Sequence, residues 1–372
     1  MNKIKLVQII ADSKIGGGPN HILGILRNID KEKFDCFLIC PKGFLSDEAK
    51  KIDEITVINV EMKSKFDLKS VLQLREELQE IKAEKDPFGP MIVHSHGPRA
   101  GFISRLISPI GAKLVYTEHL LTKNYRLGSP LNYWLQKKII SIQNQKTDLI
   151  IAVSSSVKDY LVENNLAPSE KMVVINNAIE LADINSEKKV KSANKAPIIG
   201  TVGSLNVQKG QEYLIEAMSL MKLKYPLATL EIIGDGPLKN PLKLKAKELG
   251  IERNVSFLGY KENIEKYIKH WDVFVLPSVS ETFGIVVLEA MRAGVPVVAS
   301  NVGGVKDIIT NNVNGILVKS KNPKEIANAA LKIIGHPALA AKMKRSGKER
   351  VRDFSWQKKI KELENSYLGL FF

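Results

Sequence analysis

Residues 273–289 read VFVLPSVSETFGIVVLE, and this stretch determines which class of fold the chain adopts. Its first four residues, Val273 to Leu276, are apolar and of strand length, and the run stops at Pro277. A short loop carrying Glu281 follows, and a helix is predicted to begin near Phe283. A strand, a short loop and a helix in this order are typical of the repeating unit of a parallel α/β sheet.

The predicted helix start in this stretch also suits a phosphate. Free backbone N–H groups and the positive end of the helix dipole favour anions there, and Gly284 allows a close approach of the backbone. From Phe283 to Glu289 the helix rises about 9 Å. The carboxylates of Glu281 and Glu289 are therefore predicted to flank a diphosphate. A solvated helix carboxylate with an N-terminal cap is the alternative, but the apolar neighbours Leu288 and Met291 disfavour it.

Strand-length apolar runs recur along the whole chain, separated mostly by helix-period segments. In the first half they cover 4–11, 34–40, 56–60, 91–94, 114–117 and 149–153. In the second half they cover 198–202, 229–233, 255–259, 273–276, 296–298 and 315–318. Both halves open with a strand, a glycine-bearing loop and a helix. The fold class predicted is therefore α/β, with two doubly wound Rossmann-like domains facing each other across a cleft.

Domain limits follow from the same pattern. Residues 1–185 are expected to form the first domain and residues 197–354 the second. Between them, residues 186–196 are polar and rich in lysine without apolar periodicity, which is typical of a linker. The last segment, 355–372, is predicted to form a helix that crosses back to the first domain.

Composition excludes several classes of protein. The chain has 372 residues, 44% of them apolar, which is enough for two globular domains. Its two cysteines, Cys36 and Cys40, lie in an apolar run, which argues against a disulfide scaffold and for a reducing compartment. No stretch approaches the ~18 apolar residues that a membrane span needs. We expect a cytoplasmic protein that can associate peripherally with a membrane.

The formal charge of +15 is unevenly distributed. Residues 101–150 and 301–350 carry most of the excess, which suits phosphates or an anionic membrane surface. In the first of these segments, Leu131, Trp134, Leu135 and Ile142 recur at helical spacing beside lysines. We interpret them as core packing beneath a solvated basic face, with a contact to anionic lipid as the alternative. Nucleic acid is not expected as a partner, because no recognition motif is present.

Several motifs together resemble the family 4 retaining glycosyltransferases of the GT-B fold. The first is a pair of glutamates eight positions apart around Phe-Gly, as Glu281 and Glu289 stand here. The others are IAVS (151–154), GSL with KG (203–205 and 209–210), GDGP (234–237), VSFLG (255–259) and AGVPVVA (293–299). The resemblance covers nearly the whole chain and implies that a sugar moves from a nucleotide diphosphate to an acceptor.

The resemblance also implies roles for residues of the second half. Glu281 would meet the donor sugar, Glu289 the ribose, and the backbone of Phe283, Gly284 and Ile285 the phosphates. Lys209 matches the lysine that neutralises the leaving diphosphate. Where the family usually has an arginine this chain has Ser204, which lacks its charge. The remaining donor-binding residues of this half are Gly259 and Thr282.

In the first half, Gly17 and Gly18 resemble the glycine-rich loop that closes over the donor phosphates. As a dinucleotide fingerprint the loop is weak, because His21 stands where a third glycine or alanine belongs. The resemblance implies that His119 has the role of the family's catalytic histidine, with His96 lining the cleft and His94 behind it. His94 and His96 share a strand face and suggest a metal, but no third ligand is evident.

The function implied is a retaining transfer from a nucleotide sugar, with UDP as the favoured nucleotide, to a glycan or lipid-linked acceptor in surface polysaccharide or glycolipid synthesis. His119, Lys209 and Glu281 are the predicted catalytic residues, and no metal or other cofactor is implied. Two alternatives remain open. One is a UDP-sugar 2-epimerase of the same fold, and the other is a non-catalytic protein that binds nucleotide sugars.

Overall fold

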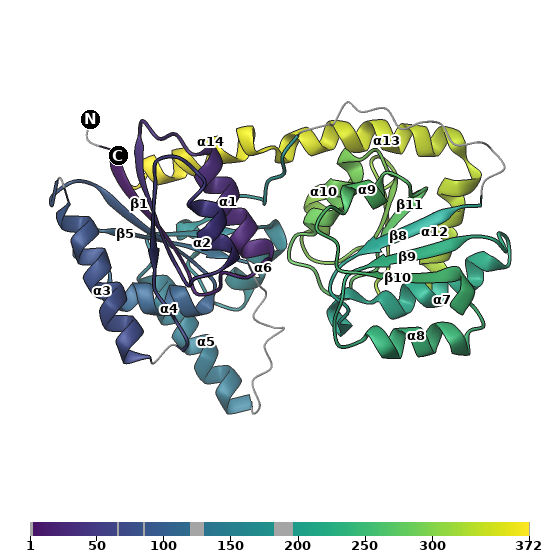
Figure 1. The fold of residues 1–372 in the computed structure, drawn as a ribbon, viewed down its shortest axis with the longest axis horizontal. Coiled ribbons are helices and arrows are strands. Elements are labelled where there is room, and N and C mark those ends of the chain that lie inside the picture. The colour runs from purple at the N-terminus through teal and green to yellow at the C-terminus, as the bar shows by residue number, and fades with distance from the viewer. Residues whose placement is uncertain (1–2, 65–66, 85, 120–129, 182–195, 372) are drawn as a thin grey trace. The chain divides into compact units, whose positions relative to one another are not determined.

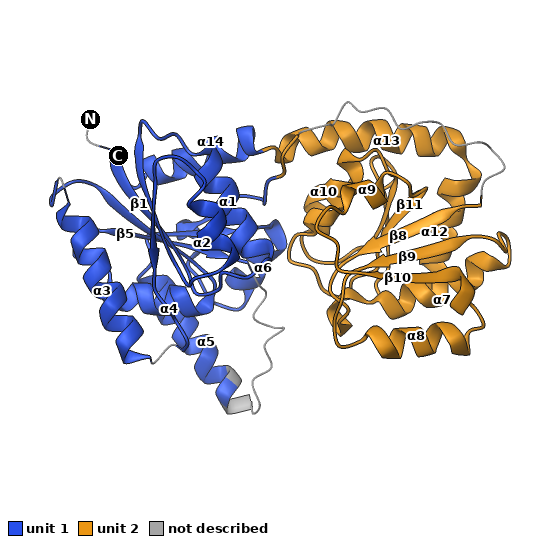
Figure 2. Ribbon diagram, in the orientation of Figure 1, with its two compact units in different colours: residues 1–178, 356–372 blue, residues 179–355 orange. Residues whose placement is uncertain are grey.

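The computed structural model describes residues 3–64, 67–84, 86–119, 130–181 and 196–371. The chain divides into two compact units (Figure 2). Unit 1 comprises residues 1–178 with 356–372, and unit 2 comprises residues 179–355. Of the predicted linker, residues 186–195 lie outside the described residues. Each unit is described by itself.

Unit 1 is built on a seven-stranded sheet in which every neighbouring pair is parallel. Its order is β3-β2-β1-β4-β5-β6-β7. The strands are β1 (Ile4–Ile10), β2 (Phe34–Cys40), β3 (Ile55–Asn59), β4 (Met91–His96), β5 (Lys113–Glu118), β6 (Leu149–Ala152) and β7 (Met172–Val174). The sequence predicted all of them except β7, whose three residues are too few to show a period.

Helices cover both faces of this sheet (Figure 1). They are α1 (Gly17–Asn28), α2 (Phe44–Ala49), α3 (Leu68–Ala83), α4 (Pro98–Ile107), α5 (Pro130–Gln145), α6 (Ser155–Glu163) and α14 (Trp356–Leu368). Successive residues of β1 supply opposite faces: Leu6 packs in the core beneath α1 and α14, and Val7 in the core beneath α3 and α4. Cys36 and Cys40 of β2 are buried and free.

The C-terminal helix α14 belongs to unit 1, although it follows unit 2 in the chain. It packs against α1, and the contact requires a glycine at position 24. A Cβ atom there would lie 1.8 Å from a ring atom of Trp356. Further along α14, Tyr367 is fully buried against Phe34, with the two rings 5.8 Å apart.

Unit 2 repeats the architecture on a six-stranded parallel sheet of order β10-β9-β8-β11-β12-β13. Its strands are β8 (Ile198–Val202), β9 (Thr229–Ile233), β10 (Val255–Gly259), β11 (Val273–Leu276), β12 (Val297–Ser300) and β13 (Ile316–Val318). Its helices are α7 (Gln211–Lys222), α8 (Lys239–Glu248), α9 (Glu265–Ile268), α10 (Ile285–Arg292), α11 (Val305–Ile308), α12 (Pro323–Gly335) and α13 (Pro337–Val351). The predicted fold of two doubly wound α/β domains is confirmed.

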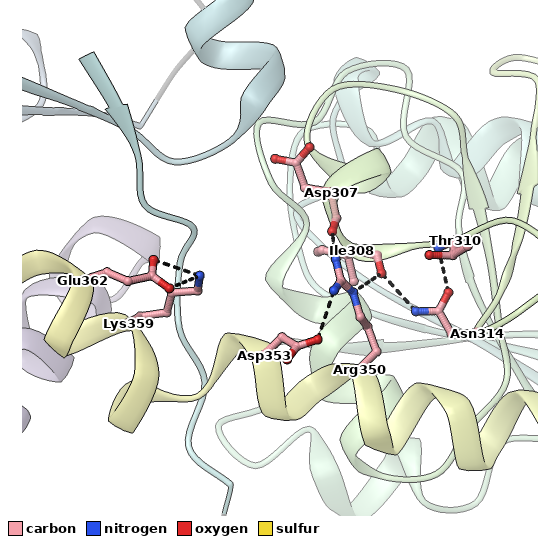
Figure 3. Close-up of polar contacts among 8 residues, drawn as sticks. All are labelled: Asp307, Ile308, Thr310, Asn314, Arg350, Asp353, Lys359 and Glu362. Carbon is pink, nitrogen blue, oxygen red and sulfur yellow. Dashed lines mark hydrogen bonds and ion pairs between the residues drawn. The ribbon is translucent and has the colours of Figure 1, made fainter. Parts of the chain in front are cut away.

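Arg350 holds the end of α13 to the end of α11 (Figure 3). Its guanidinium donates to the carbonyl oxygens of Asp307 and Ile308 and to the carboxylate of Asp353. Asn314 donates to the same Ile308 carbonyl and accepts from the amide of Thr310. These bonds satisfy the carbonyls that α11 leaves free at its end. They fix the segment from which the chain returns to unit 1.

The strand orders define where ligands are expected to bind. In each sheet the order reverses at one position, between β1 and β4 in unit 1 and between β8 and β11 in unit 2. In open parallel sheets, ligands bind beyond the carboxyl ends of the strands at such a reversal. Gly17 and Gly18 follow β1 and His96 ends β4, whereas Lys209 follows β8 and Glu281 follows β11. The fold thus places these five predicted site residues at the two reversal points.

Candidate functional site

In unit 2 the predicted catalytic lysine and glutamate form an ion pair. The Nζ atom of Lys209 lies 2.6 Å from Oε2 of Glu281, and the two side chains are 25% and 10% exposed. Lys209 ends a short 3-10 turn, Val207–Lys209, whose Asn206 side chain caps the turn by accepting from the Lys209 amide. Ser278 lies 3.4 Å from the same carboxylate oxygen. A cation and an anion are thus held side by side with one edge open to solvent.

Backbone contacts join the two loops that carry this pair. The amides of Val279 and Ser280 both donate to the carbonyl of Gln208. Gly210 has a φ of +62°, and a Cβ atom there would lie 2.4 Å from the carbonyl oxygen of Pro277. A glycine is therefore needed at this position for the loop after β8 to reach the loop after β11. The KG pair in the sequence reflects this close approach.

Helix α10 begins beside the pair and offers its N-terminus. Gly284 caps the helix with a φ of +94°, and Ile285 is the first helical residue. The sequence placed the helix start near Phe283, so it was early by two residues. Phe283 instead points into the core, 1% exposed, where its ring lies 5.7 Å from that of Phe354. The buried ring holds the backbone that leads into the helix.

Glu289 lies one turn into α10, and burial raises the pKa of its carboxyl to about 7. Arg292 opposes this shift and Glu265 adds to it. Arg292 itself is bound to Glu265 and to the carbonyl of Glu180. The carboxyl of Glu289 is therefore poorly solvated and only weakly compensated. A ligand with hydroxyl donors would satisfy it.

The other predicted residues of unit 2 take different places. Ser204 is exposed, and its hydroxyl accepts from the side chain of Asn206. Thr282 lies in the loop between Glu281 and Phe283. Gly259 ends β10, with a φ of +71°, and its carbonyl accepts from the amide of Gly234. Because β9 lies between β10 and β8, Gly259 is two strands away from the strand that precedes Lys209.

In unit 1 the structure brings the four predicted residues Gly17, Gly18, His96 and His119 to one cavity of about 1100 Å³. Gly17 and Gly18 form the first turn of α1, so the free amides of that helix start lie at the cavity wall. The wall also contains basic side chains: Lys14, Lys42, Lys63 and Arg99. Asp12 and Glu61 add two acidic groups. The cavity therefore suits an anionic or polyhydroxyl ligand.

Four histidines cluster beside this cavity, and two of them, His96 and His119, line it. The rings of His94 and His96 are 4.2 Å apart, as their shared strand face predicts. Nδ1 of His96 lies 3.1 Å from Nε2 of His119, and the ring of His21 lies 5.1 Å from that of His119. Burial and mutual repulsion lower the pKa of His21 and His96 well below the ordinary value. Burial is also the main cause that lowers the pKa of His94 to about 3 and that of His119 to about 4. All four imidazoles are neutral at physiological pH.

Two buried side chains orient the cluster, and the sequence did not reveal either. Gln8 of β1 accepts from Nε2 of His96 through Oε1, at 2.6 Å, and donates through Nε2 to the hydroxyl of Tyr367. That hydroxyl also lies 2.6 Å from Nδ1 of His94, whose Nε2 bonds to Thr117. The sequence also did not reveal His21 as a member of the cluster. Its position in a helix does not indicate that its ring lies near those of His96 and His119. A polar residue in an otherwise apolar strand, as Gln8 is, was the one available signal.

The prediction for helix α5 is wrong. Trp134 is 53% exposed, Leu135 44%, Ile139 45% and Ile142 54%, so this stripe is not core packing. Lys138 lies within 5.2 Å of the ring of Trp134. Of the basic residues near it in the sequence, Lys123 and Arg126 lie outside the described residues, as does the side chain of Leu131. None of the described helices is both long and apolar enough to span a membrane.

Comparison with known proteins identifies the family. A family model described as Glycosyltransferase Family 4 matches residues 15–183, and one described as Glycosyl transferases group 1 matches residues 183–350. An uncharacterized glycosyltransferase of Methanocaldococcus jannaschii is 37% identical over 281 residues, which cover 75% of this chain and 69% of the relative. A second relative, from Escherichia coli, is the UDP-Gal:α-D-GlcNAc-diphosphoundecaprenol α-1,3-galactosyltransferase. It is 24% identical, and the alignment covers 99% of this chain and 98% of the relative.

Among solved structures, HepE of Anabaena in complex with UDP has a TM-score of 0.81 at 20% identity and covers 99% of this chain and 100% of its own. The same protein in complex with UDP-glucose has a TM-score of 0.80 at 19% identity, covering 98% and 99%. The two parallel-sheet units of the present chain therefore match the GT-B fold. The chain belongs to the glycosyltransferases.

Proposed function

We propose that this glycosyltransferase moves a sugar from a UDP-sugar to an acceptor hydroxyl with retention of anomeric configuration. The observation that carries the proposal is the contact of Lys209 with Glu281 beside the start of α10. A lysine at a helix N-terminus suits a departing diphosphate, and a neighbouring carboxylate suits sugar hydroxyls. HepE, which has the same architecture, is solved with UDP and with UDP-glucose, and this supports the choice of nucleotide.

The proposed chemistry is a front-face substitution. The bond from the anomeric carbon to the diphosphate oxygen breaks as the bond to the acceptor oxygen forms, and the acceptor proton passes to the departing phosphate. Lys209 and the backbone amides of Phe283, Gly284 and Ile285 stabilise the negative charge on the leaving group. Glu281 binds the donor sugar and Glu289 the ribose, with Ser204, Gly259 and Thr282 lining the donor site. No metal takes part.

In unit 1, Gly17, Gly18, His96 and His119 are assigned to the donor. His119 orients the reacting groups through the imidazole nitrogen that His96 does not engage. The lysines and Arg99 on the cavity wall favour an acceptor that itself carries phosphate. The Escherichia coli relative is named for a diphosphoundecaprenol acceptor, which supports a lipid-linked acceptor in surface glycan synthesis.

The exposed apolar stripe of α5 supports a peripheral contact with an anionic membrane. Trp134 and Ile142 expose apolar area beside Lys138, an arrangement that binds headgroups electrostatically and buries the apolar face at the interface. We expect the protein to sediment with vesicles of phosphatidylglycerol and to remain in the supernatant with vesicles of phosphatidylcholine. Equal recovery of wild type and the variant Trp134→Ser with Ile142→Ser contradicts this part.

Donor binding is tested by thermal shift with UDP, GDP and ADP, each with and without chelator. A ligand at 100 times its dissociation constant adds about 2.7 kcal/mol to the native state. We expect UDP alone to stabilise the protein, chelator to have no effect, and Glu289→Gln to lose the shift. The control is Glu252→Gln, an exposed glutamate of the same unit. Stabilisation of the Glu289→Gln variant equal to wild type contradicts the ribose assignment.

Transfer is tested with UDP-sugars and a GlcNAc-diphospho-lipid acceptor, with UDP release and the anomeric signal of the product as readouts. Lys209→Met is expected to lower kcat by about 10²–10³, the usual loss of one charge-stabilising donor. An α-linked product from an α-linked donor supports retention. Formation of a free epimer without acceptor identifies an epimerase instead. UDP binding with neither transfer nor hydrolysis of any donor indicates a non-catalytic binding protein.

A further inference from the structure

The histidine cluster of unit 1 has a chemistry that sugar transfer does not use. Three of its members, His21, His96 and His119, each offer one imidazole nitrogen, and these three nitrogens all lie within 4.8 Å of one another. They come from three elements: the first turns of α1, the end of β4 and the residue after β5. The sequence suggested a metal from His94 and His96 and found no third ligand. In the tertiary structure, His21 and His119 join His96 as the candidate ligands, and His94 is not among them.

The separations suit one transition-metal ion. Two nitrogens bound to the same tetrahedral Zn²⁺ lie about 3.4 Å apart, because each Zn–N bond is about 2.0–2.1 Å. His96 Nδ1 and His119 Nε2 already lie 3.1 Å apart. The nitrogen of His21 has to approach by no more than about 1.4 Å to reach the same separation from both. Rotation of the imidazole about its side-chain torsions gives a movement of that size.

Hydrogen bonding prepares His96 as a ligand. Gln8 Oε1 accepts from Nε2 of His96, so the proton of the neutral ring is on Nε2 and the lone pair of Nδ1 points toward His119. Metal-binding histidines almost always donate their second N–H to an oxygen in this way. The hydroxyl of Tyr367 in turn holds the amide group of Gln8. The supporting bonds that a metal site needs are therefore in place.

The His96–His119 contact can be satisfied by a proton alone, but His21 requires another explanation. Its Nδ1 atom is buried and has no hydrogen-bond partner among the described residues. A buried imidazole nitrogen without a hydrogen-bond partner destabilises the folded chain. A cation bound at this atom would give it a partner, because neutral imidazole suits Zn²⁺ and similar ions as a ligand.

We propose that His21, His96 and His119 form a binding site for one divalent transition-metal ion of the Zn²⁺ type. His96 and His119 line the cavity, so a fourth coordination position is open to water or to a ligand there. The site does not serve the transfer reaction, for which no metal is proposed. It also does not depend on the proposed function, because binding is measured without any substrate.

The experiment titrates the full-length, metal-stripped protein, free of any polyhistidine tag, with Co²⁺ and follows the visible bands of four-coordinate cobalt. We expect one equivalent to bind and Zn²⁺ to displace it. His21→Ala and His119→Ala are expected to weaken binding by more than the roughly 10–100-fold typical of losing a supporting residue. His336→Ala, which removes an exposed histidine of unit 2, is expected to bind as wild type does.

A second measurement uses only the wild type, so that its result does not depend on whether the variants fold. The chain has only six histidines, so ¹⁵N-histidine spectra of the wild type resolve each ring. Zn²⁺ is expected to shift the nitrogens of His21, His96 and His119 and to leave those of His270 and His336 unchanged. The proposal is overturned if no cobalt binds, if binding survives His21→Ala, or if the bands are those of cobalt bound to cysteine thiolate.

Discussion

Lys209 and Glu281 are 72 residues apart in the chain, and their charged atoms lie 2.6 Å apart. Neither side chain is more than a quarter exposed. Each follows a different strand, β8 and β11, and those strands are neighbours only because the sheet order reverses between them. The pair therefore joins the two loops at the reversal point. Its two charges neutralise each other, and a bound diphosphate would compete with Glu281 for Lys209.

Removal of Lys209 is expected to destabilise the protein. In Lys209→Met the carboxylate of Glu281 keeps its burial and loses its cation, at a cost of about 1–3 kcal/mol in the free energy of unfolding. Urea denaturation measures the change. The control is Lys239→Met, which breaks a more exposed pair with Asp235 in the same unit and is expected to cost much less, because solvent screens that pair. Equal losses in the two variants contradict the argument.

The stability of the protein should depend on pH through Glu289. Its carboxyl pKa is about 7 in the folded chain against 4.5 for an unperturbed glutamate, so the native state holds the proton more tightly than the unfolded state. Stability therefore falls as pH rises from about 4.5 to about 7, and is then constant. The full loss is about 3 kcal/mol. Unfolding free energies of wild type and Glu289→Gln, measured at pH 5 and pH 8, isolate this contribution.

Other groups titrate over the same pH interval. They are present in both the wild type and the Glu289→Gln variant, so their contribution cancels in the difference between the two. We therefore expect the difference in unfolding free energy, wild type minus variant, to fall between pH 5 and pH 8. A difference that stays constant, or that rises, shows that the carboxyl of Glu289 titrates normally in the folded chain.

The contact of α14 with α1 should not accept a larger residue at position 24. Gly24→Ala places a methyl group 1.8 Å from the ring of Trp356, so the helix or the ring has to move, at a cost of about 1–3 kcal/mol. Gly335→Ala at the end of α12 is the matched control, because no atom lies within 4 Å of the added methyl group. A thermal midpoint of Gly24→Ala equal to that of wild type contradicts the packing described.

Zinc should inhibit sugar transfer. An ion bound to one nitrogen of His119 fixes the ring whose other nitrogen orients the reacting groups in the proposed reaction, so activity is expected to fall as the site fills and to return when a chelator is added. His21→Ala removes a metal ligand and is expected to raise the inhibitory zinc concentration at least tenfold. His336→Ala should match wild type. Inhibition that is equal in all three proteins arises from another site.

The sequence by itself determined the architecture, because every strand except β7 is visible as a local apolar run. The runs at 198–202, 229–233, 255–259 and 273–276 were predicted with the bounds that the structure has. Strands buried on both faces are continuously apolar, which needs no knowledge of distant residues. The glutamates around Phe283-Gly284 and the lysine before Gly210 were visible for the same reason, since each motif is contiguous.

The tertiary structure decided which distant residues meet and which faces are covered. His21 meets His96 and His119 because α1 packs beside the ends of β4 and β5, and Gln8 meets Tyr367 across 359 residues. The stripe of Trp134 and Ile142 has the spacing of a core face, yet it is exposed. Helical period reports which residues share a face, whereas only the packing of other elements determines whether that face is buried.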